Sequence, residues 1–596
     1  MGIIKKITAA FCAAAVAVSL SGCFAYLPRP AYWDKDGMIE YALKYRNIPW
    51  LTELLTDCTP RERAEYAFKI VDNWVEPGRL YAADAICEMG VDFDDTDYPM
   101  IAMSAKKLDY EAVKYFLEKG ADPNIRDSDD YTPLYYALEN ASGQWEASGY
   151  YLSKLLVENG AEPYPEMFRN EYEGDPERNV GNGAYRQIAH SPMTTKFLLG
   201  ILLDGGQESG LPKAVEYAIL GECEKSLNEL KSGNTVSDVD MGLISYYFGY
   251  FGTMEQYQEF ADFWGKYAKP PASCVAGAGN VEVLKRLYLN KDPDNEESKE
   301  FVLDFRDHDL LSIALVMNQT EVVKLLLSYT SINNDWIEWS FDSAFCGDVE
   351  CFKLLYDFNK KVNGEFKDEW LKHFSPDRYL SMINKYEIID FLFDEGLDCR
   401  YVDLEFCTAD TVKYLYKKGR PLMLSDLTIA STWGDHEFIK AVIEEGKANV
   451  NYGGSFDFRT SYDDTKYDGD KLLHKYQGSP ETKEKYMTYE ELCKVVEPNG
   501  GLTQLCLYQT PETLQYVIDQ GLILPEDCLL DKFSYQYSAA NVRVLLENGA
   551  NTKATIDTIP DGSRELGFIK RGEFTVKEYF EACDRPDLVE LLKEYE

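Results

Sequence analysis

A search for residues that could carry out chemistry begins with the five histidines of this 596-residue chain. A zinc-protease helix carries two His four residues apart, with a Glu directly after the first. His436 and Glu437 begin this pattern, but Lys440 stands where the second His is required. No other pair of His has ligand spacing, and the chain has no CxxC motif. We therefore expect no metal ion and no other cofactor, and we interpret the His436 segment as an ordinary helix.

An aspartate-rich stretch near residue 468 supplies the oxygen atoms that calcium prefers as ligands. Asp464, Asp468 and Asp470 lie around a glycine, as in a calcium-binding loop. However, Lys466 occupies a position that needs an oxygen ligand, and Lys475 replaces the bidentate Glu. The stretch therefore does not predict a calcium site.

Motifs for nucleotide binding and nucleophilic catalysis are also incomplete. The sequence GAGN at 277–280 lacks the third Gly and the Lys of nucleotide-binding loops, and no GxSxG motif occurs. Pairs of carboxylates carry little information, because 102 of the 596 residues are acidic. We assign no catalytic residue and expect the protein not to be an enzyme.

A short phrase recurs along the chain and defines the elements that would position any functional residue. An amphipathic stretch is followed by Gly and a small or apolar residue. Val113, Phe116 and Leu117 share one helical face, and Gly120 then favours the left-handed conformation that ends a helix. A unit this short cannot bury its own apolar face, so neighbouring units must stack. The same pattern ends at Gly90, Gly120, Gly160, Gly396, Gly419, Gly446, Gly521 and Gly549.

One unit preserves more than the helix. Its sequence, IRDSDDYTPLYYALEN at 125–140, contains a turn and then Thr132-Pro133 at the start of a helix. With the preceding AVKYFLEKGADPN, it resembles the ankyrin repeat, although Asp130 replaces the family Gly and Tyr135 the family His. Similar but weaker matches begin at Cys274, Ala344 and Phe574. The resemblance covers most of residues 38–596, unevenly.

The resemblance implies an all-α fold, an ankyrin-like helical solenoid that binds another protein. The capping glycines lie 40 residues apart from Gly120 to Gly160 but 23 apart from Gly396 to Gly419, against about 33 in a regular repeat. We therefore expect irregular loops and short or missing hairpins. Our candidate binding residues lie in the best-preserved unit and are Asp127, Asp129, Asp130, Tyr131 and Tyr135.

The first residues have the pattern of an export signal. Lys5 and Lys6 precede an apolar run that ends in Leu-Ser-Gly-Cys at Cys23. This ending resembles the bacterial lipobox, which implies a signal peptide at 1–22 and a lipid on Cys23 as the membrane anchor. An ordinary signal peptide with a chance Cys is the alternative. We expect the protein at the cell envelope, and by family analogy Phe24 favours the outer membrane, on its periplasmic or surface side, if the cell is Gram-negative.

The rest of the chain divides by composition. Residues 23–37 form a proline-containing tether, 38–451 a degenerate ankyrin-like solenoid, 452–500 a polar insert, and 501–596 the C-terminal repeats and cap. Residues 164–192 form a second polar insert. Such inserts are either binding elements or mobile loops without a role in binding.

The formal net charge of −41 limits the choice of partner. This surface repels phosphate backbones, so we expect no nucleic-acid binding. The acidity either keeps the protein soluble or attracts a basic protein or divalent cations. The sequence leaves these possibilities open.

Twelve cysteines remain once Cys12 and Cys23 are set aside. Cys87 and Cys351 occupy apolar helix positions, where Cys acts as a small hydrophobic residue. The pairs Cys346 with Cys351 and Cys399 with Cys407 are close in sequence, but spacing alone does not establish a disulfide.

Two hypotheses for function follow. In the first, the protein is a lipid-anchored, non-catalytic envelope scaffold that binds an unknown and possibly basic protein, for example as an inhibitor of a basic toxin. In the second, it is an envelope hydrolase or carbohydrate-active protein whose site lies in an insert or in residues 200–275, where the repeat pattern is faint. A pocket with two acidic groups of perturbed pKa would favour the second hypothesis.

Overall fold

The structure, a computed structural model, groups the chain into two compact units. The terminal unit comprises Met1–Asp57 together with Pro498–Glu596, and the central unit comprises Cys58–Glu497. Residues 38–57, expected at the start of the long solenoid, thus belong with the C-terminal repeats. The structure describes residues 35–44, 46–73, 78–93, 95, 97, 99–141, 145–168, 186–266, 268–289, 308–329, 340–341, 343–363, 385–402, 404, 407–423, 425–453, 465–468, 471–476, 485–493, 499–531, 533–560 and 569–595.

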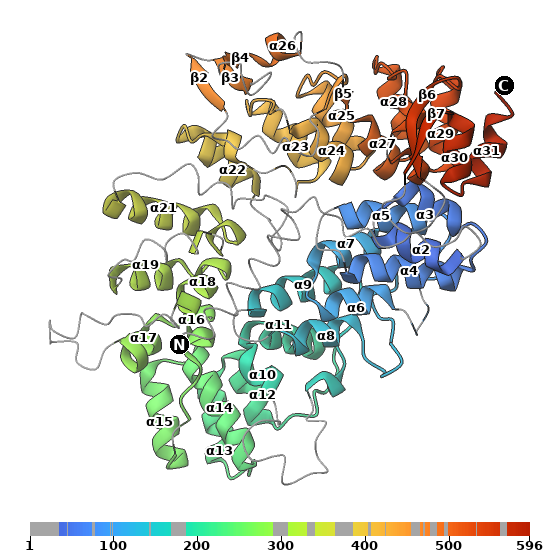
Figure 1. The fold of residues 1–596 in the computed structure, drawn as a ribbon. Coiled ribbons are helices and arrows are strands. Elements are labelled where there is room, and N and C mark those ends of the chain that lie inside the picture. Colours follow the sequence, from blue (N-terminus) through green and yellow to red (C-terminus); the bar gives the residue numbers. More distant parts are fainter. Residues whose placement is uncertain are drawn as a thin grey trace. The chain divides into compact units, whose positions relative to one another are not determined.

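Most of the central unit is helical, as Figure 1 shows. The α-helices among its described residues are α4 (Pro60–Asn73), α5 (Gly78–Cys87), α6 (Met100–Lys106), α7 (Tyr110–Glu118), α8 (Pro133–Glu139), α9 (Glu146–Glu158), α10 (Arg186–His190), α11 (Pro192–Asp204), α12 (Lys213–Leu220), α13 (Cys223–Lys231), α14 (Asp238–Phe251), α15 (Met254–Trp264), α16 (Ala272–Gly277), α17 (Val281–Leu284), α18 (His308–Val316), α19 (Thr320–Tyr329), α21 (Val349–Asn363), α22 (Lys385–Asp394), α23 (Ala409–Lys417), α24 (Asp426–Trp433), α25 (His436–Glu444) and α26 (Tyr489–Leu492).

These helices stack in the two rows of a solenoid. First helices of successive pairs pack on one another, α6 on α8 and α12 on α14, α16 and α18 in turn. Second helices do the same, α7 on α9, α13 on α15, and α17 on α19 and then α21. Each pair therefore buries its apolar face against its neighbours, which confirms the expected all-α, ankyrin-like architecture.

Helix α7 shows how the repeated phrase builds a helix. The Asp109 side chain accepts a hydrogen bond from the Ala112 amide (3.1 Å), and Val113 and Phe116 are fully buried. Gly120 then adopts φ +92°, and the next amide, that of Ala121, returns to the Phe116 carbonyl (3.0 Å). Gly ends the helix because this left-handed conformation is costly for a residue with a Cβ.

The expectation that Gly446 ends its helix in the same way is wrong. The left-handed residue there is Lys447, at φ +61°. A Cβ on Gly446 would lie 2.6 Å from the Val442 carbonyl oxygen and 2.8 Å from the Tyr416 ring. This glycine is needed for close packing.

The polar insert contains strands. A three-stranded antiparallel sheet has the order β2 (Thr465–Asp468), β3 (Lys471–Tyr476), β4 (Lys485–Met487). The first two strands form a hairpin with Asp468 opposite Lys471, and α26 packs on β3. The short strand β1 (Tyr452–Gly453) precedes this sheet.

The terminal unit combines both ends of the chain. From the N-terminal side it takes α2 (Lys35–Lys44) and α3 (Ile48–Leu54). Helix α3 packs against α27 and α29, although α27 begins 448 residues and α29 485 residues after α3 ends. The C-terminal elements are β5 (Asn499–Gly500), α27 (Leu502–Tyr508), α28 (Pro511–Asp519), α29 (Ala539–Glu547), the antiparallel hairpin β6 (Thr555–Pro560) and β7 (Ile569–Thr575), α30 (Val576–Ala582) and α31 (Pro586–Leu592).

Candidate functional site

Four of the five candidate binding residues lie on the finger loop 122–132, between α7 and α8, and the fifth, Tyr135, lies in the first turn of α8. Asp127 holds this loop in shape. Its carboxylate accepts hydrogen bonds from the amides of Asp129 and Tyr131, each at 3.0 Å, and from the Tyr136 hydroxyl. Burial and this last bond raise the pKa of Tyr136 above its usual value. The Asp127 carboxylate therefore mainly stabilises the turn.

Asp130 occupies the position where the ankyrin phrase has Gly, and it adopts the left-handed conformation at φ +67°. Arg126 supports this backbone by donating to the Asp130 carbonyl oxygen at 2.9 Å. The two side chains also form an ion pair at 3.1 Å, while the Asp130 side chain stays 82% exposed. Asp129 is exposed as well. These two carboxylates are thus available to a partner.

The two tyrosines differ in exposure. The rings of Tyr131 and Tyr135 stack with centroids 4.1 Å apart and planes 9° apart. Tyr135 is buried, only 5% exposed, whereas Tyr131 is half-buried. Thr132 caps the helix that carries Tyr135, through the Tyr135 amide. Tyr131 therefore lies at the surface of the loop, and the buried ring of Tyr135 packs against it.

Asn124 joins this loop to the next one, a role that sequence reasoning missed. Its side-chain amide donates to the Gly160 carbonyl (2.8 Å) and its oxygen accepts from the Glu162 amide (2.8 Å). The Arg126 guanidinium lies 4.6 Å from the centre of the Tyr164 ring. The signal was present in the sequence, because both repeated phrases continue past their glycine, as GADPN and as GAEP. Adjacent finger loops are fixed to one another by these contacts.

Glu146, at the start of α9, is a second residue that sequence reasoning missed. It is fully buried, and one carboxylate oxygen accepts from the Met193 amide at 2.6 Å. Burial raises the pKa of Glu146 to about 8, although the Met193 bond opposes this. Tyr247, Tyr250 and Cys274 interact with it electrostatically. These three groups are two hydroxyls and a thiol, whereas most glycosidases pair two carboxyls across a cleft.

The motifs considered for metal and nucleotide chemistry have structural roles. His436 begins α25, where Glu437 binds Lys440 at 2.9 Å and Lys413 at 3.2 Å. The GAGN segment is the turn between α16 and α17, with Gly279 at φ +81° and Asn280 capping α17. Among the described residues, no cluster of three His, Cys, Asp or Glu side chains is arranged to hold a metal ion.

Cys87 and Cys351, which were expected to act as core side chains, are free thiols. Burial raises the pKa of Cys87 to about 11 and that of Cys351 to about 12. Both thiols therefore remain protonated and act as core side chains, as expected.

Several predictions concern residues outside the described part of the chain. They include the signal peptide 1–22, the lipidation of Cys23, most of the tether 23–37 and most of the insert 164–192. Within the described helices, none combines the length and the apolar composition needed to cross a bilayer.

Rows of stacked helix pairs with finger loops define a helical-repeat protein of the ankyrin-like kind. Residues 100–144, which contain α6, α7, the finger loop and α8, match the family model described as ankyrin repeats, many copies. A comparison with curated proteins finds no match to the chain. The ankyrin repeat is a non-catalytic module that binds other proteins, and the candidate residues lie within the matched segment.

Proposed function

We propose that the protein is a non-catalytic scaffold, anchored to the cell envelope by a lipid on Cys23, that binds a partner protein with a basic surface. The observation that carries this proposal is the ankyrin match at 100–144 together with the exposed Asp129 and Asp130 on its finger loop. In a Gram-negative cell, the sequence after Cys23 favours the outer membrane.

The geometry of the finger loop suits binding. Asp127 and Asn124 use hydrogen bonds within the protein to fix the loop, so little conformational entropy is lost when a partner docks. Asp129 and Asp130 then offer carboxylates for Arg or Lys side chains of the partner. Tyr131 adds a partly exposed aromatic ring, a residue type that is favoured at interfaces.

The proposal is tested by affinity capture from envelope extract with residues 24–596, which lack the lipid. We expect a basic protein in stoichiometric amount, and at least about tenfold less of it with Asp129→Asn combined with Asp130→Asn, since each charged contact contributes about 1 kcal/mol or more. The matched control is Asp204→Asn with Glu208→Gln, two exposed acidic residues elsewhere in the central unit.

Equal recovery with both double variants would contradict the proposed surface. Recovery of no protein, together with turnover of a small substrate by the purified chain, would contradict the scaffold function itself.

The anchor has its own test. Replacing Cys23 by Ser removes the sulfur that would carry the lipid, so we expect the protein to move from the membrane fraction to the soluble fraction. Continued membrane retention of Cys23→Ser would show that the anchor lies elsewhere.

A further inference from the structure

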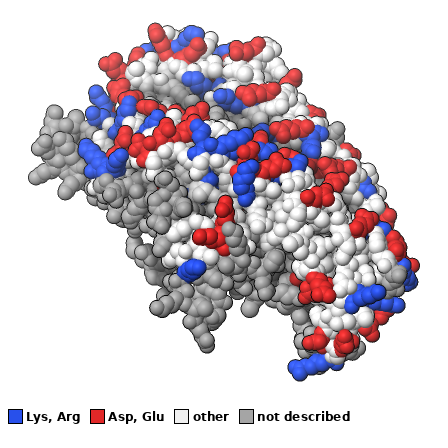
Figure 2. All heavy atoms as spheres, turned by 90° about the horizontal axis from the view of Figure 1, so that it is seen from above, with Lys and Arg blue, Asp and Glu red and all other residues white. Residues whose placement is uncertain are grey.

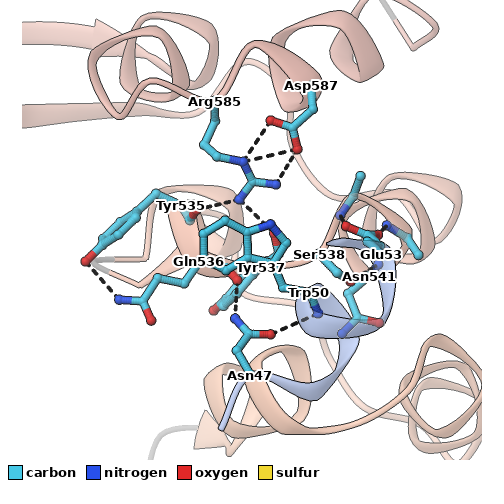
Figure 3. Close-up of polar contacts among 12 residues, drawn as sticks. Asn47, Trp50, Glu53, Tyr535, Gln536, Tyr537, Ser538, Asn541, Arg585 and Asp587 are labelled. Atoms are coloured by element: carbon cyan, nitrogen blue, oxygen red, sulfur yellow. Dashed lines mark hydrogen bonds and ion pairs between the residues drawn. The ribbon is translucent and has the colours of Figure 1, made fainter. Parts of the chain in front are cut away.

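Helix α3 lies among the C-terminal elements of the terminal unit and presents one polar and aromatic face to them. Asn47, Trp50 and Glu53 are spaced three residues apart, so they lie along one side of the helix. Figure 3 shows all three directed at the segment 535–541 and at Arg585. Each makes a different kind of contact.

Glu53 caps a helix from the other end of the chain. Its carboxylate accepts hydrogen bonds from the amides of Ala539 (3.1 Å) and Ala540 (2.8 Å), in the first turn of α29. Ser538 satisfies a third amide, that of Asn541, at 3.0 Å. The first turn of a helix has unsatisfied N–H groups and a partial positive charge, so a carboxylate is stabilising there.

Trp50 covers a buried charge. Arg585 is fully buried, with its Nε 2.8 Å from Asp587 Oδ1 and an Nη 2.9 Å from the Tyr537 carbonyl oxygen. The guanidinium carbon lies 5.3 Å from the centre of the Trp50 ring, which is 2% exposed. Removing Trp50 would leave one side of this guanidinium without its aromatic partner.

Asn47 links the helix start to an irregular segment. Its oxygen accepts from the Trp50 amide at 3.1 Å and caps α3, while its side-chain amide donates to the Gln536 carbonyl. Among the described residues between α28 and α29, the segment that contains Gln536 forms two 3-10 turns, at Cys528–Leu530 and Ser534–Gln536. The described residues between α28 and α29 thus form no regular helix, and α3 packs against both α27 and α29.

We propose that α27, α29, Gln536 and Arg585 form a helix-binding seat, and that the N-terminal pair α2–α3 is its tethered ligand, which folds on binding. We call this set of residues the helix seat. It recognises a helix with the face Asn-x-x-Trp-x-x-Glu. The proposal is independent of the scaffold function.

The size of the pair supports a ligand that folds on binding. Two helices of 10 and 7 residues are too short to be stable alone, because the first turn of a helix is costly to form and a small pair buries little surface. Met38, Ala42, Leu51 and Leu55 nevertheless have no exposed surface in the structure. The contacts that α3 makes with the helix seat therefore stabilise both partners.

The test uses residues 24–596 with a protease recognition sequence inserted between Asp57 and Cys58, where Asp57 is exposed. The chain is folded and then cleaved. We expect the fragment 24–57 to co-elute with the body in size-exclusion chromatography, and a fluorescent peptide of residues 35–57 to exchange into the helix seat.

Two variants and a control probe the recognised face. Trp50→Ala and Glu53→Gln are expected to lower fragment retention at least about tenfold and about threefold, respectively. Glu40→Gln, an exposed residue of α2, is expected to have no effect. If cleavage exposes the amides of α29 to hydrogen exchange, excess peptide should restore their protection.

Three outcomes would overturn the proposal. The first is loss of the fragment while the α29 amides stay protected, and the second is equal retention by all variants. The third is an uncleaved chain that elutes as a dimer with exchanging subunits, because the helix seat would then be filled by a second copy.

Discussion

At the scale of single residues, Glu146 is a carboxyl group that the fold removes from water. It is fully buried between α9 and the start of α11, and burial raises its pKa from 4.5 to about 8. The folded protein therefore keeps a proton on Glu146 that the unfolded chain releases above pH 4.5. Stability contributed by this protonated carboxyl is complete below pH 4.5 and is lost as the pH rises to about 8.

Glu146→Gln should remove this pH dependence, because Gln keeps the shape without the charge. For the wild type we expect unfolding of the central unit to become easier by up to about 1.4 kcal/mol per pH unit between pH 5 and 8. Urea unfolding at several pH values measures this slope. Glu158→Gln, an exposed residue on the same helix, should keep the wild-type slope. Identical slopes for the wild type and Glu146→Gln would disprove the assignment.

At the scale of elements, neighbouring helices are joined by a recurring polar contact. A carboxylate of one helix, or of the residue just after it, binds both a Tyr hydroxyl and a Lys from a single turn of the adjacent helix. The tyrosine and lysine are always four residues apart, so they share a face. The three sets are Asp84 with Tyr115 and Lys119, Glu395 with Tyr356 and Lys360, and Asp390 with Tyr414 and Lys418.

Replacing Asp390 by Asn should weaken the contact between α22 and α23. The Tyr414 hydroxyl lies 2.7 Å and the Lys418 ammonium 2.6 Å from the carboxylate. Burial opposes the charge, but these two donors hold the pKa of Asp390 below its usual value, so its contribution is lost only in acid. Because the pair is partly exposed, we expect a loss of about 1 kcal/mol in urea unfolding at pH 7.

A double-mutant cycle with Lys418→Met provides the control. If the two side chains interact, the stability losses of the two single variants should add up to more than the loss of the double variant. If the sum equals the loss of the double variant, the side chains act independently.

At the scale of the whole molecule, acidic residues outnumber basic ones. The chain has 102 acidic and 61 basic residues. On the face seen in Figure 2, basic side chains nevertheless lie directly beside acidic ones. Some of the basic side chains form ion pairs between helices, such as Lys231 with Glu259 and Lys413 with Glu437. The remaining acidic groups repel one another in the folded protein.

Salt should therefore stabilise the chain as a whole. Between about 10 and 150 mM NaCl the screening length falls from about 30 to about 8 Å, which weakens long-range repulsion more than close pairs. We expect the melting temperature to rise by several degrees over this range, as measured by calorimetry. A melting temperature that falls with added salt would show that the ion pairs outweigh the net repulsion.

Much of the repeat architecture could be predicted from the sequence. The amphipathic spacing of α7 and the Gly120 that ends it lie close together in the sequence, so a short stretch of residues is enough to predict both the helix and its end. Although Asp130 replaces the family Gly, the turn could still be predicted, because Asp tolerates the left-handed conformation better than most residues. Prediction failed at Gly446, where the requirement comes from the ring of Tyr416, 30 residues away.

The candidate site was only partly predictable for the same reason. The sequence placed five candidate residues in one repeat unit, but only burial separates the exposed Asp129 and Asp130 from the buried Tyr135. Asn124 binds a backbone amide 38 residues away, which only the repetition of the phrase after Gly120 and Gly160 signals. Glu146 binds a backbone amide 47 residues away, and no local sequence pattern predicts that contact.

The sequence by itself determined the helices, their ends and the need for them to stack, since each short amphipathic unit must cover its apolar face with a neighbour. Only the tertiary structure decided which neighbour covers the first pair. Nothing near Trp50 in the sequence indicates that its partner is Arg585, because pairing over such a separation depends on complementary surfaces that form only when the two segments come together in the folded unit.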